Sequence, residues 1–325
     1  MSVTGSGTSA DPYVVETYDE LKTTVENNSG DLYIKFADNV KIDLTQVYSG
    51  AESPYITIKT DRNLSIDGNG AVISGYSNSE NGMFWGGSSS NSDKWFELKN
   101  ITIDSMYTPN SGLLEPKILP RFDRVKIAGA VGGKDALILA RGYYDYPEGW
   151  IRQSSFTISK NRYDTADNGG RLVIFADATR SYSWPSDLGG GGYAIAAGLF
   201  ITDCIIDVTS IVKVHIIAAG GGSWNSKKTI FSRNTVKINK GTPVRRIWDF
   251  GDNNEIDISN TVIRGNSEET ITLYSYGSNF TGVAIVDGTN LPNAVLEGSP
   301  NPFKILTVEE MKNPAYLRSI GFECV

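Results

Sequence analysis

The chain has 325 residues, of which 40% are hydrophobic and 10% aromatic, so it can bury a full core, and general disorder is excluded. Its net charge of -7 and pI of about 5.0 argue against a nucleic-acid partner, because phosphate binding needs a basic face. The sequence has neither the charged and apolar leader of a signal peptide nor a stretch of about 18 apolar residues. We therefore expect no signal peptide and no membrane insertion.

The first predicted element is an amphipathic helix over residues 17–26. Thr17 and Glu20 have the spacing of a capping box, and Leu21 and Val25 lie on one face of the helix. A single helix placed before a run of strands is suited to cover the open end of a strand array. Residues 1–30 are therefore predicted to form an N-terminal strand and a capping helix.

A short unit then repeats, in which a polar residue precedes two or three aliphatic residues. The polar positions are Asp67, Asn100, Arg124, Ser155, Asp203, Asn234 and Asn260. They lie about 24 to 33 residues apart, except for one interval of about 48, which we interpret as two turns with residues 171–175 between them. Strands at this period predict a solenoid over residues 31–299, with about nine or ten coils. Asn and Asp at its turns are expected to adopt left-handed geometry and to bond the neighbouring coil.

This register places Ile205 and Val262 in the bore of the solenoid. Two insertions, residues 141–150 and 181–193, are expected to project from it and to form the contacts of a homo-trimer. Residues 300–325 are predicted to form a C-terminal cap. Its apolar side chains are expected to seal the second end, and they are Met311, Leu317, Ile320 and Phe322.

Two stretches carry a family resemblance. Residues 66–75 (Ile-Asp-Gly-Asn-Gly-Ala-Val-Ile-Ser-Gly) resemble an early coil of the right-handed parallel β-helices of the pectin-lyase-like class, and residues 231–236 look like one of their standard turns. The resemblance covers residues 10–295 and implies an all-β fold, a single right-handed parallel β-helix.

The two ends of the chain carry a second resemblance. Residues 5–13 and 306–322 look like segments of virion proteins of phages and prophages from Gram-positive hosts. This likeness implies a structural virion component, either a head decoration or a tail appendage, assembled in the host cytoplasm with other virion proteins. Binding to a host cell-surface glycan is a further role that it implies.

The sequence assigns no catalytic residue, metal or cofactor. His215 is the single histidine, and Cys204 and Cys324 are too far apart in sequence for a common zinc motif. Cys204 stands among aliphatic residues and is interpreted as a small core residue. No nucleophile elbow of the Gly-x-Ser-x-Gly type occurs.

Two other functions stay open: a β-helix polysaccharide lyase or hydrolase, and a glycan-binding module without catalysis. For an enzyme, the candidate carboxylates and bases are Asp249, Asp252, Glu255, Asp257, Arg245 and Arg246. For glycan binding, the candidate stacking residues are Tyr143, Tyr144, Tyr146, Trp150 and Trp184. Carboxylates that converge with an arginine in a groove would favour an enzyme, and scattered carboxylates would favour a structural role.

Overall fold

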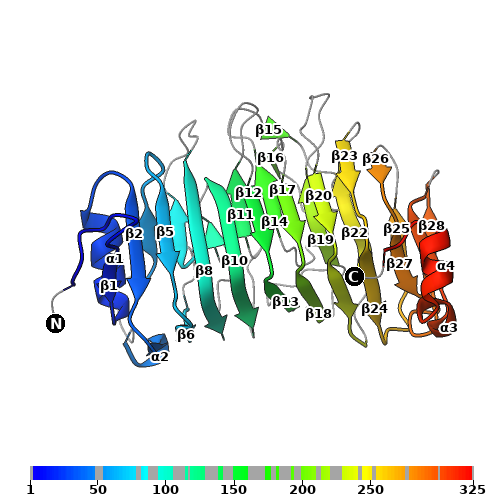
Figure 1. Cartoon of the computed structure of the whole chain (residues 1–325), viewed down its shortest axis with the longest axis horizontal. Helices are drawn as coiled ribbons and strands as arrows, with labels where there is room; N and C mark the ends of the chain where they lie inside the picture. Colours follow the sequence, from blue (N-terminus) through cyan, green and yellow to red (C-terminus); the bar gives the residue numbers. More distant parts are fainter. Residues whose placement is uncertain are drawn as a thin grey trace.

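The computed structural model describes most of the chain in segments. These are residues 3–47, 54–77, 82–86, 94–104, 114–115, 118–128, 138–141, 149–159, 173–176, 181–182, 192–193, 199–209, 214–219, 229–240, 244–250, 254–274, 278–298 and 301–323. Figure 1 shows their strands stacked side by side along the long axis, with α1 at one end and α3 and α4 at the other.

The strands form three ladders in which each strand pairs in parallel with the corresponding strand of the next coil. The first ladder is β1 (Tyr13–Val15), β2 (Leu32–Phe36), β5 (Leu64–Asp67), the first halves of β8 (Trp95–Asp104) and β10 (Leu119–Ala128), β12 (Gly149–Arg152), β17 (Leu199–Thr202), β20 (Thr229–Ser232), β23 (Asn254–Asp257) and β26 (Ser278–Thr281). The second is β3 (Lys41–Asp43), β6 (Val72–Ser74), the second halves of β8 and β10, β13 (Ser155–Ser159), β18 (Ile205–Thr209), β21 (Thr235–Ile238), β24 (Thr261–Gly265), β27 (Ala284–Asp287) and β29 (Phe303–Leu306).

The third ladder is β4 (Ile56–Ile58), β7 (Phe84–Gly86), β9 (Leu114–Glu115), β11 (Ile138–Arg141), β14 (Val173–Ala176), β19 (Val214–Ala219), β22 (Val244–Phe250), β25 (Ile271–Tyr274) and β28 (Ala294–Glu297). Its nine strands, counted over the described residues, agree with the predicted nine or ten coils. The fold is thus a large, curled, mostly parallel β-sheet, consistent with a β-helix-like solenoid.

The core lies inside the three ladders, where alternate residues of each strand stack in columns. One column runs through Phe156, Ile206, Val236, Ile263 and Val286, each at most 1% exposed. Because each residue packs on its equivalents in the coils before and after it, the core is continuous from coil to coil.

The turn between the first and second ladders repeats one backbone geometry. Its left-handed residues have φ between 49° and 61°, and they include Asn69, Asn100, Arg124, Gln153, Asp203, Arg233 and Asn260. The expectation for Asn and Asp is confirmed, and arginine and glutamine adopt the same conformation. The stacked coils therefore impose a geometry that these longer side chains seldom adopt on their own.

Polar side chains follow the later left-handed positions and point inward at Ser154, Asn234 and Thr261, whereas the buried Ile101 and Val125 follow Asn100 and Arg124. Asn234, 1% exposed, accepts a hydrogen bond from the Cys204 backbone N–H (2.9 Å) and donates one to the Ile201 carbonyl (2.8 Å). Thr261 donates from its hydroxyl to the Phe231 carbonyl (2.9 Å). These side chains form hydrogen bonds with backbone groups that have no strand partner at the turn between the first and second ladders.

Helix α1 (Tyr18–Asn27) covers the first coil. Its predicted capping box between Thr17 and Glu20 is present. Leu21 and Val25 are fully buried in the core.

Side chains of the same helix also form hydrogen bonds with the free edge of β4, the first strand of the third ladder. The Glu26 carboxylate accepts from the Thr57 N–H (2.9 Å), and the Lys22 ammonium donates to the Tyr55 carbonyl (2.5 Å). At the end of the helix, the buried Arg62 guanidinium donates to the carbonyls of Val25 and Asn28. The helix therefore protects a strand edge that would otherwise be open to another chain.

The remaining helices are α2 (Leu44–Val47), α3 (Val308–Met311) and α4 (Pro314–Ser319). The predicted capping box between Thr307 and Glu310 is present at α3. Leu317 and Phe322 bury against Ile285 and Leu306, in a cluster separate from the main core. The expectation that this segment seals the end of the bore is wrong, because it packs on the outer face of the second ladder. None of the described helices is long and apolar enough to cross a membrane.

Two details of the predicted repeat are also wrong. The interval of about 48 residues is one coil, because Ser155 on β13 lies directly opposite Ile205 on β18. Residues 173–176 form β14 of the third ladder, and an antiparallel hairpin, β15 (Ser181–Tyr182) with β16 (Gly192–Tyr193), lies within the same interval. The added length is therefore an insertion.

The predicted register is shifted by one residue. Ile205 is 43% exposed, whereas Ile206 is fully buried. Val262 is only partly buried and packs against the outer cluster, whereas Ile263 is in the core. The cause is the left-handed turn between the first and second ladders. Cys204, the residue directly after the turn, already points inward, and strand alternation then turns the next residue outward.

Candidate functional site

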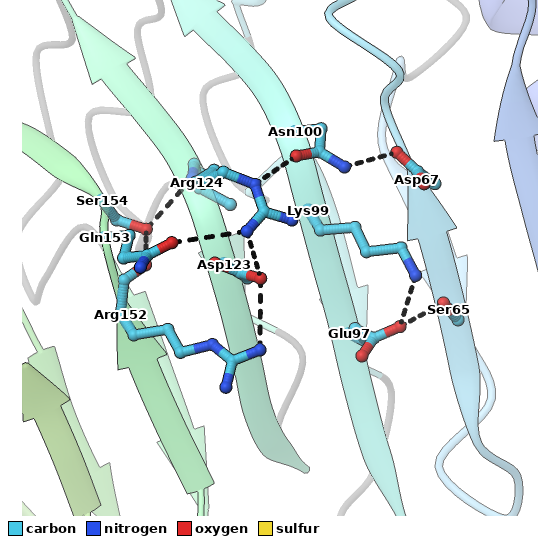
Figure 2. Close-up of polar contacts among 11 residues, drawn as sticks. Ser65, Asp67, Glu97, Lys99, Asn100, Asp123, Arg124, Arg152, Gln153 and Ser154 are labelled. Carbon is cyan, nitrogen blue, oxygen red and sulfur yellow. Dashed lines mark hydrogen bonds and ion pairs between the residues drawn. The ribbon is translucent and has the colours of Figure 1, made fainter.

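The outer face of the first ladder gathers charged side chains on β5, β8, β10 and β12 (Figure 2). The aromatic Trp95 and Trp150 lie on the same face. Alternate residues of these strands share the face and lie in register. One row is Ser65, Glu97, Arg121 and Trp150, and the next row is Asp67, Lys99, Asp123 and Arg152. We call this surface the β5–β12 face.

Glu97 occupies the centre of the first row. Its carboxylate accepts a hydrogen bond from the Ser65 hydroxyl at 2.5 Å and lies 3.4 Å from the Lys99 ammonium. The Glu97 side chain is 21% exposed. It is therefore held from two sides and still reaches the surface.

Asp123 is the buried carboxylate of the face. Its Oδ2 lies 2.9 Å from Arg124 Nη1 and 3.2 Å from Arg152 Nη2, and both arginines are about half exposed. Its Oδ1 is buried and has no hydrogen-bond partner within the described segments. Two guanidinium groups thus cover one carboxylate, which satisfies the rule that buried charges are paired.

Side chains of the left-handed turn extend this network along the rod. Asn100 donates to Asp67 Oδ1 (2.9 Å) and accepts at its Oδ1 from Arg124 Nε (2.6 Å). Arg124 Nη1 also donates to Gln153 Oε1 (3.3 Å). A hollow of about 420 Å³ lies beside these residues, lined by Asn69, Gly70, Asn100, Ile101, Thr102 and Arg124.

Aromatic rings on the face carry stacked guanidinium groups. Arg121 Cζ lies 4.8 Å from the Trp95 ring centroid, and Arg152 Cζ lies 4.4 Å from that of Trp150. Tyr33 meets Trp95 edge to face, with centroids 6.4 Å apart. Burial lowers the pKa of Arg121, against the opposing effect of nearby Glu97, but a guanidinium stays protonated at neutral pH.

The β5–β12 face is balanced in charge on a chain whose net charge is -7. Its cations are Lys99, Arg121 and Arg152, and its carboxylates are Asp67, Glu97 and Asp123. Arg124 on the adjacent turn adds one positive charge, so the surface offers donors to polar or anionic groups.

The structure describes only part of the predicted site. Trp150 lies on the β5–β12 face. The other aromatic candidates, and one acidic candidate, lie outside the described residues: Tyr143, Tyr144, Tyr146, Trp184 and Asp252. The backbones of Arg245, Arg246 and Asp249 belong to β22 in the third ladder, and those of Glu255 and Asp257 belong to β23 in the first. The predicted cluster is thus divided between two ladders.

Among those carboxylates, the structure describes the side chain of Asp257. It accepts from the backbone N–H (2.9 Å) and hydroxyl (2.5 Å) of Ser259, an arrangement typical of a turn. His215 lies on β19 with its backbone in register with Arg246. Within the described residues, no three His, Cys, Asp or Glu side chains are grouped so that they could hold a metal ion.

Cys204 is a core residue, as predicted. It is 1% exposed, and its thiol lies 3.2 Å from the Thr202 carbonyl. Burial raises the pKa of this thiol to about 12, so it remains protonated and unreactive at neutral pH.

Comparison of the chain with protein-family models, with curated proteins and with solved structures finds no match. The functional argument therefore depends on the chain's own residues.

Proposed function

We propose that the chain is a right-handed parallel β-helix and a non-enzymatic component of a phage particle, either a head decoration or a tail appendage. The stacked coils, with α1 pairing the first edge strand, support an elongated and resistant rod. The likeness of both chain ends to virion proteins supports the particle assignment. In this proposal the protein assembles in the host cytoplasm with other virion proteins.

We propose further that the rod binds a host cell-surface glycan. The observation that carries this step is the pair of tryptophans on the β5–β12 face, each with an arginine stacked on its ring. A partly exposed ring offers an apolar surface for a sugar, and a guanidinium offers several donors to its hydroxyl or acidic groups. Trp150 was a predicted stacking residue, and it lies on this face.

The geometry of the carboxylates favours binding over catalysis. A general acid or base must come within hydrogen-bond reach of the reacting proton. Asp123 is buried beneath Arg124 and Arg152, and both arginines form ion pairs with its Oδ2. Glu97 and Asp67 reach the surface. Glu97 is bound to Ser65 and Lys99, and Asp67 accepts a hydrogen bond from Asn100.

A polysaccharide lyase or hydrolase is the second candidate, and one observation favours it. Glu97 and Asp123 lie on adjacent strands of one face, with Arg121 directly opposite Glu97 in register. That arrangement partly meets the criterion of carboxylates converging with an arginine. The candidates Asp249, Asp252, Glu255 and Asp257 belong to this alternative as well.

Three measurements test these proposals. Mass spectrometry of purified particles should find the chain, and its absence would contradict the virion role. The purified protein should bind host cell-wall or capsular polysaccharide, and Trp150→Ala should weaken binding about tenfold. The matched control Trp85→Ala changes a tryptophan on the third ladder and should bind like the parent. New reducing ends or unsaturated products, with or without calcium, would support the enzyme instead.

The predicted homo-trimer remains part of the proposal, through residues 141–150 or 181–193. Lateral association would set several β5–β12 faces side by side and raise avidity for a repeating glycan. Light scattering on the free protein and on protein released from particles should give three copies or a multiple of three. A single copy in both preparations would contradict the trimer.

A further inference from the structure

The C-terminal end of the solenoid leaves its core open. The inward column that contains Ile263 and Val286 ends at Ile305 on β29, which is 38% exposed. In the third ladder, Leu296 on β28 packs over the buried Leu273 and is 41% exposed. Both side chains occupy core positions, and within the described residues both lack the neighbour that the next coil would supply.

The same end also presents strand edges. In the described residues, β28 pairs with β25 and β29 pairs with β27, each on one side. Val295 adds a third apolar side chain, at 44% exposure, on the outer face of β28. We call Val295, Leu296 and Ile305 the open end. Solenoids normally cover such an end, because exposed edges and core residues favour association.

The chain's own helices do not cover the open end. Leu317 and Phe322 pack on Ile285 and Leu306, on the outside of the second ladder. The last described residue, Glu323, bonds through its backbone N–H to Asn260 Oδ1 (2.8 Å), at the turn between the first and second ladders. The C-terminal segment therefore folds back along the rod and away from Leu296 and Ile305.

The opposite end of a second copy is a poor match for this surface. Helix α1 turns an exposed polar stripe outward, formed by Asp19, Thr23 and Asn27 at intervals of four residues. A head-to-tail contact would place these groups against Leu296 and Ile305 and would bury them at a cost. The open end of a second copy instead matches apolar surface with apolar surface.

We propose that two copies of this chain dock through their open ends, related by a two-fold axis, to form one rod of double length. Such a contact is isologous, so the same residues serve both partners and the assembly closes. It buries Leu296 and Ile305 of both copies and covers the free edges of β28 and β29. It uses neither the β5–β12 face nor the insertions assigned to the trimer, so it stands or falls independently of the proposed function.

The first test is the mass of the full-length protein in solution. Leu296→Glu should halve the mass seen at micromolar concentration, because the two-fold axis brings each introduced charge near its copy. It should weaken association about tenfold or more. Ile205→Glu is the matched control, since Ile205 is 43% exposed on the side of the rod, and it should keep the parent mass. A parent whose mass does not exceed that of Leu296→Glu overturns the proposal.

A second test distinguishes the open end from other contacts and avoids the apolar side chains. Single cysteines replace Lys304 beside the open end or Asn27 on α1, in a Cys324→Ser background. The native Cys204 is buried and, with a thiol pKa of about 12, does not react with the dye. Donor and acceptor dyes mixed on Lys304→Cys should transfer more energy than dyes on Asn27→Cys, because lateral association brings both positions together and the end contact adds only to Lys304. Transfer at Asn27 equal to or greater than that at Lys304, or transfer at neither position, overturns the proposal.

Discussion

Asn234 is the polar residue whose removal should damage the coil stack most. Its side chain is buried and pairs two backbone groups, the N–H of Cys204 in the preceding coil and the carbonyl of Ile201. Asn234→Ala leaves both groups buried without partners, and each such loss costs about 1–3 kcal/mol. We therefore expect the free energy of unfolding to fall by about 2–6 kcal/mol, a large part of a typical stability of about 5–15 kcal/mol.

Urea unfolding followed by circular dichroism measures this loss, and hydrogen exchange locates it. The Cys204 amide should lose protection in Asn234→Ala, because its acceptor is gone, while amides of distant coils stay protected. Asn279→Ala is the control, since Asn279 is exposed on β26, and it should change stability by about 0.5 kcal/mol or less. A loss below about 1 kcal/mol, with the Cys204 amide still protected, would refute the assigned role of Asn234.

The other predictions concern the register, the ion pairs and the cap. Ile206→Ala should cost about 2–5 kcal/mol, as expected for a buried site, and Ile205→Ala about 0.5 kcal/mol or less, so the reverse order in urea unfolding would contradict the register. The hydrogen bonds from Arg233 lower the pKa of Asp203, so this exposed pair stabilises the fold above the unfolded-state pKa. That contribution, at most about 1 kcal/mol, should disappear as the pH falls below about 4, and Asp203→Asn should show no such loss between pH 6 and pH 3. Glu26→Ala should free the edge of β4 and cause aggregation measurable by light scattering, and an equally monodisperse variant would argue against the cap.

The sequence correctly predicts those elements that depend on residues close together in the chain. The capping boxes at Thr17 and Thr307 involve residues three apart, and both are present in the structure. The coil spacing also followed from the sequence, because each coil returns to the same left-handed turn. The register did not follow, because the bend places one additional residue inward, and a pattern of alternating residues does not reveal where a bend interrupts it.

The β5–β12 face was missed, apart from Trp150. A signal for it does exist: Trp95, Glu97 and Lys99 alternate with the buried Phe96 and Leu98. That alternation indicates a strand with one polar face. It does not indicate which polar residues of other strands lie beside it, since coil lengths here vary from about 24 to 48 residues. The pairing of Asp123 with Arg152, for example, required the register of β10 with β12.

The two ends of the curled β-sheet show why an amphipathic segment does not by itself predict what it covers. Leu317 and Phe322 had two apolar surfaces available, the open end and the outward-facing Ile285. The segment that follows β29 packs on the nearer outer surface and buries Ile285 there. That choice leaves Ile305 uncovered, whereas α1 at the other end both fills the core and pairs the strand edge. Because one end is closed by its own chain and the other, over the described residues, is not, association through the open end would produce a finite pair of rods and no continuing fibre.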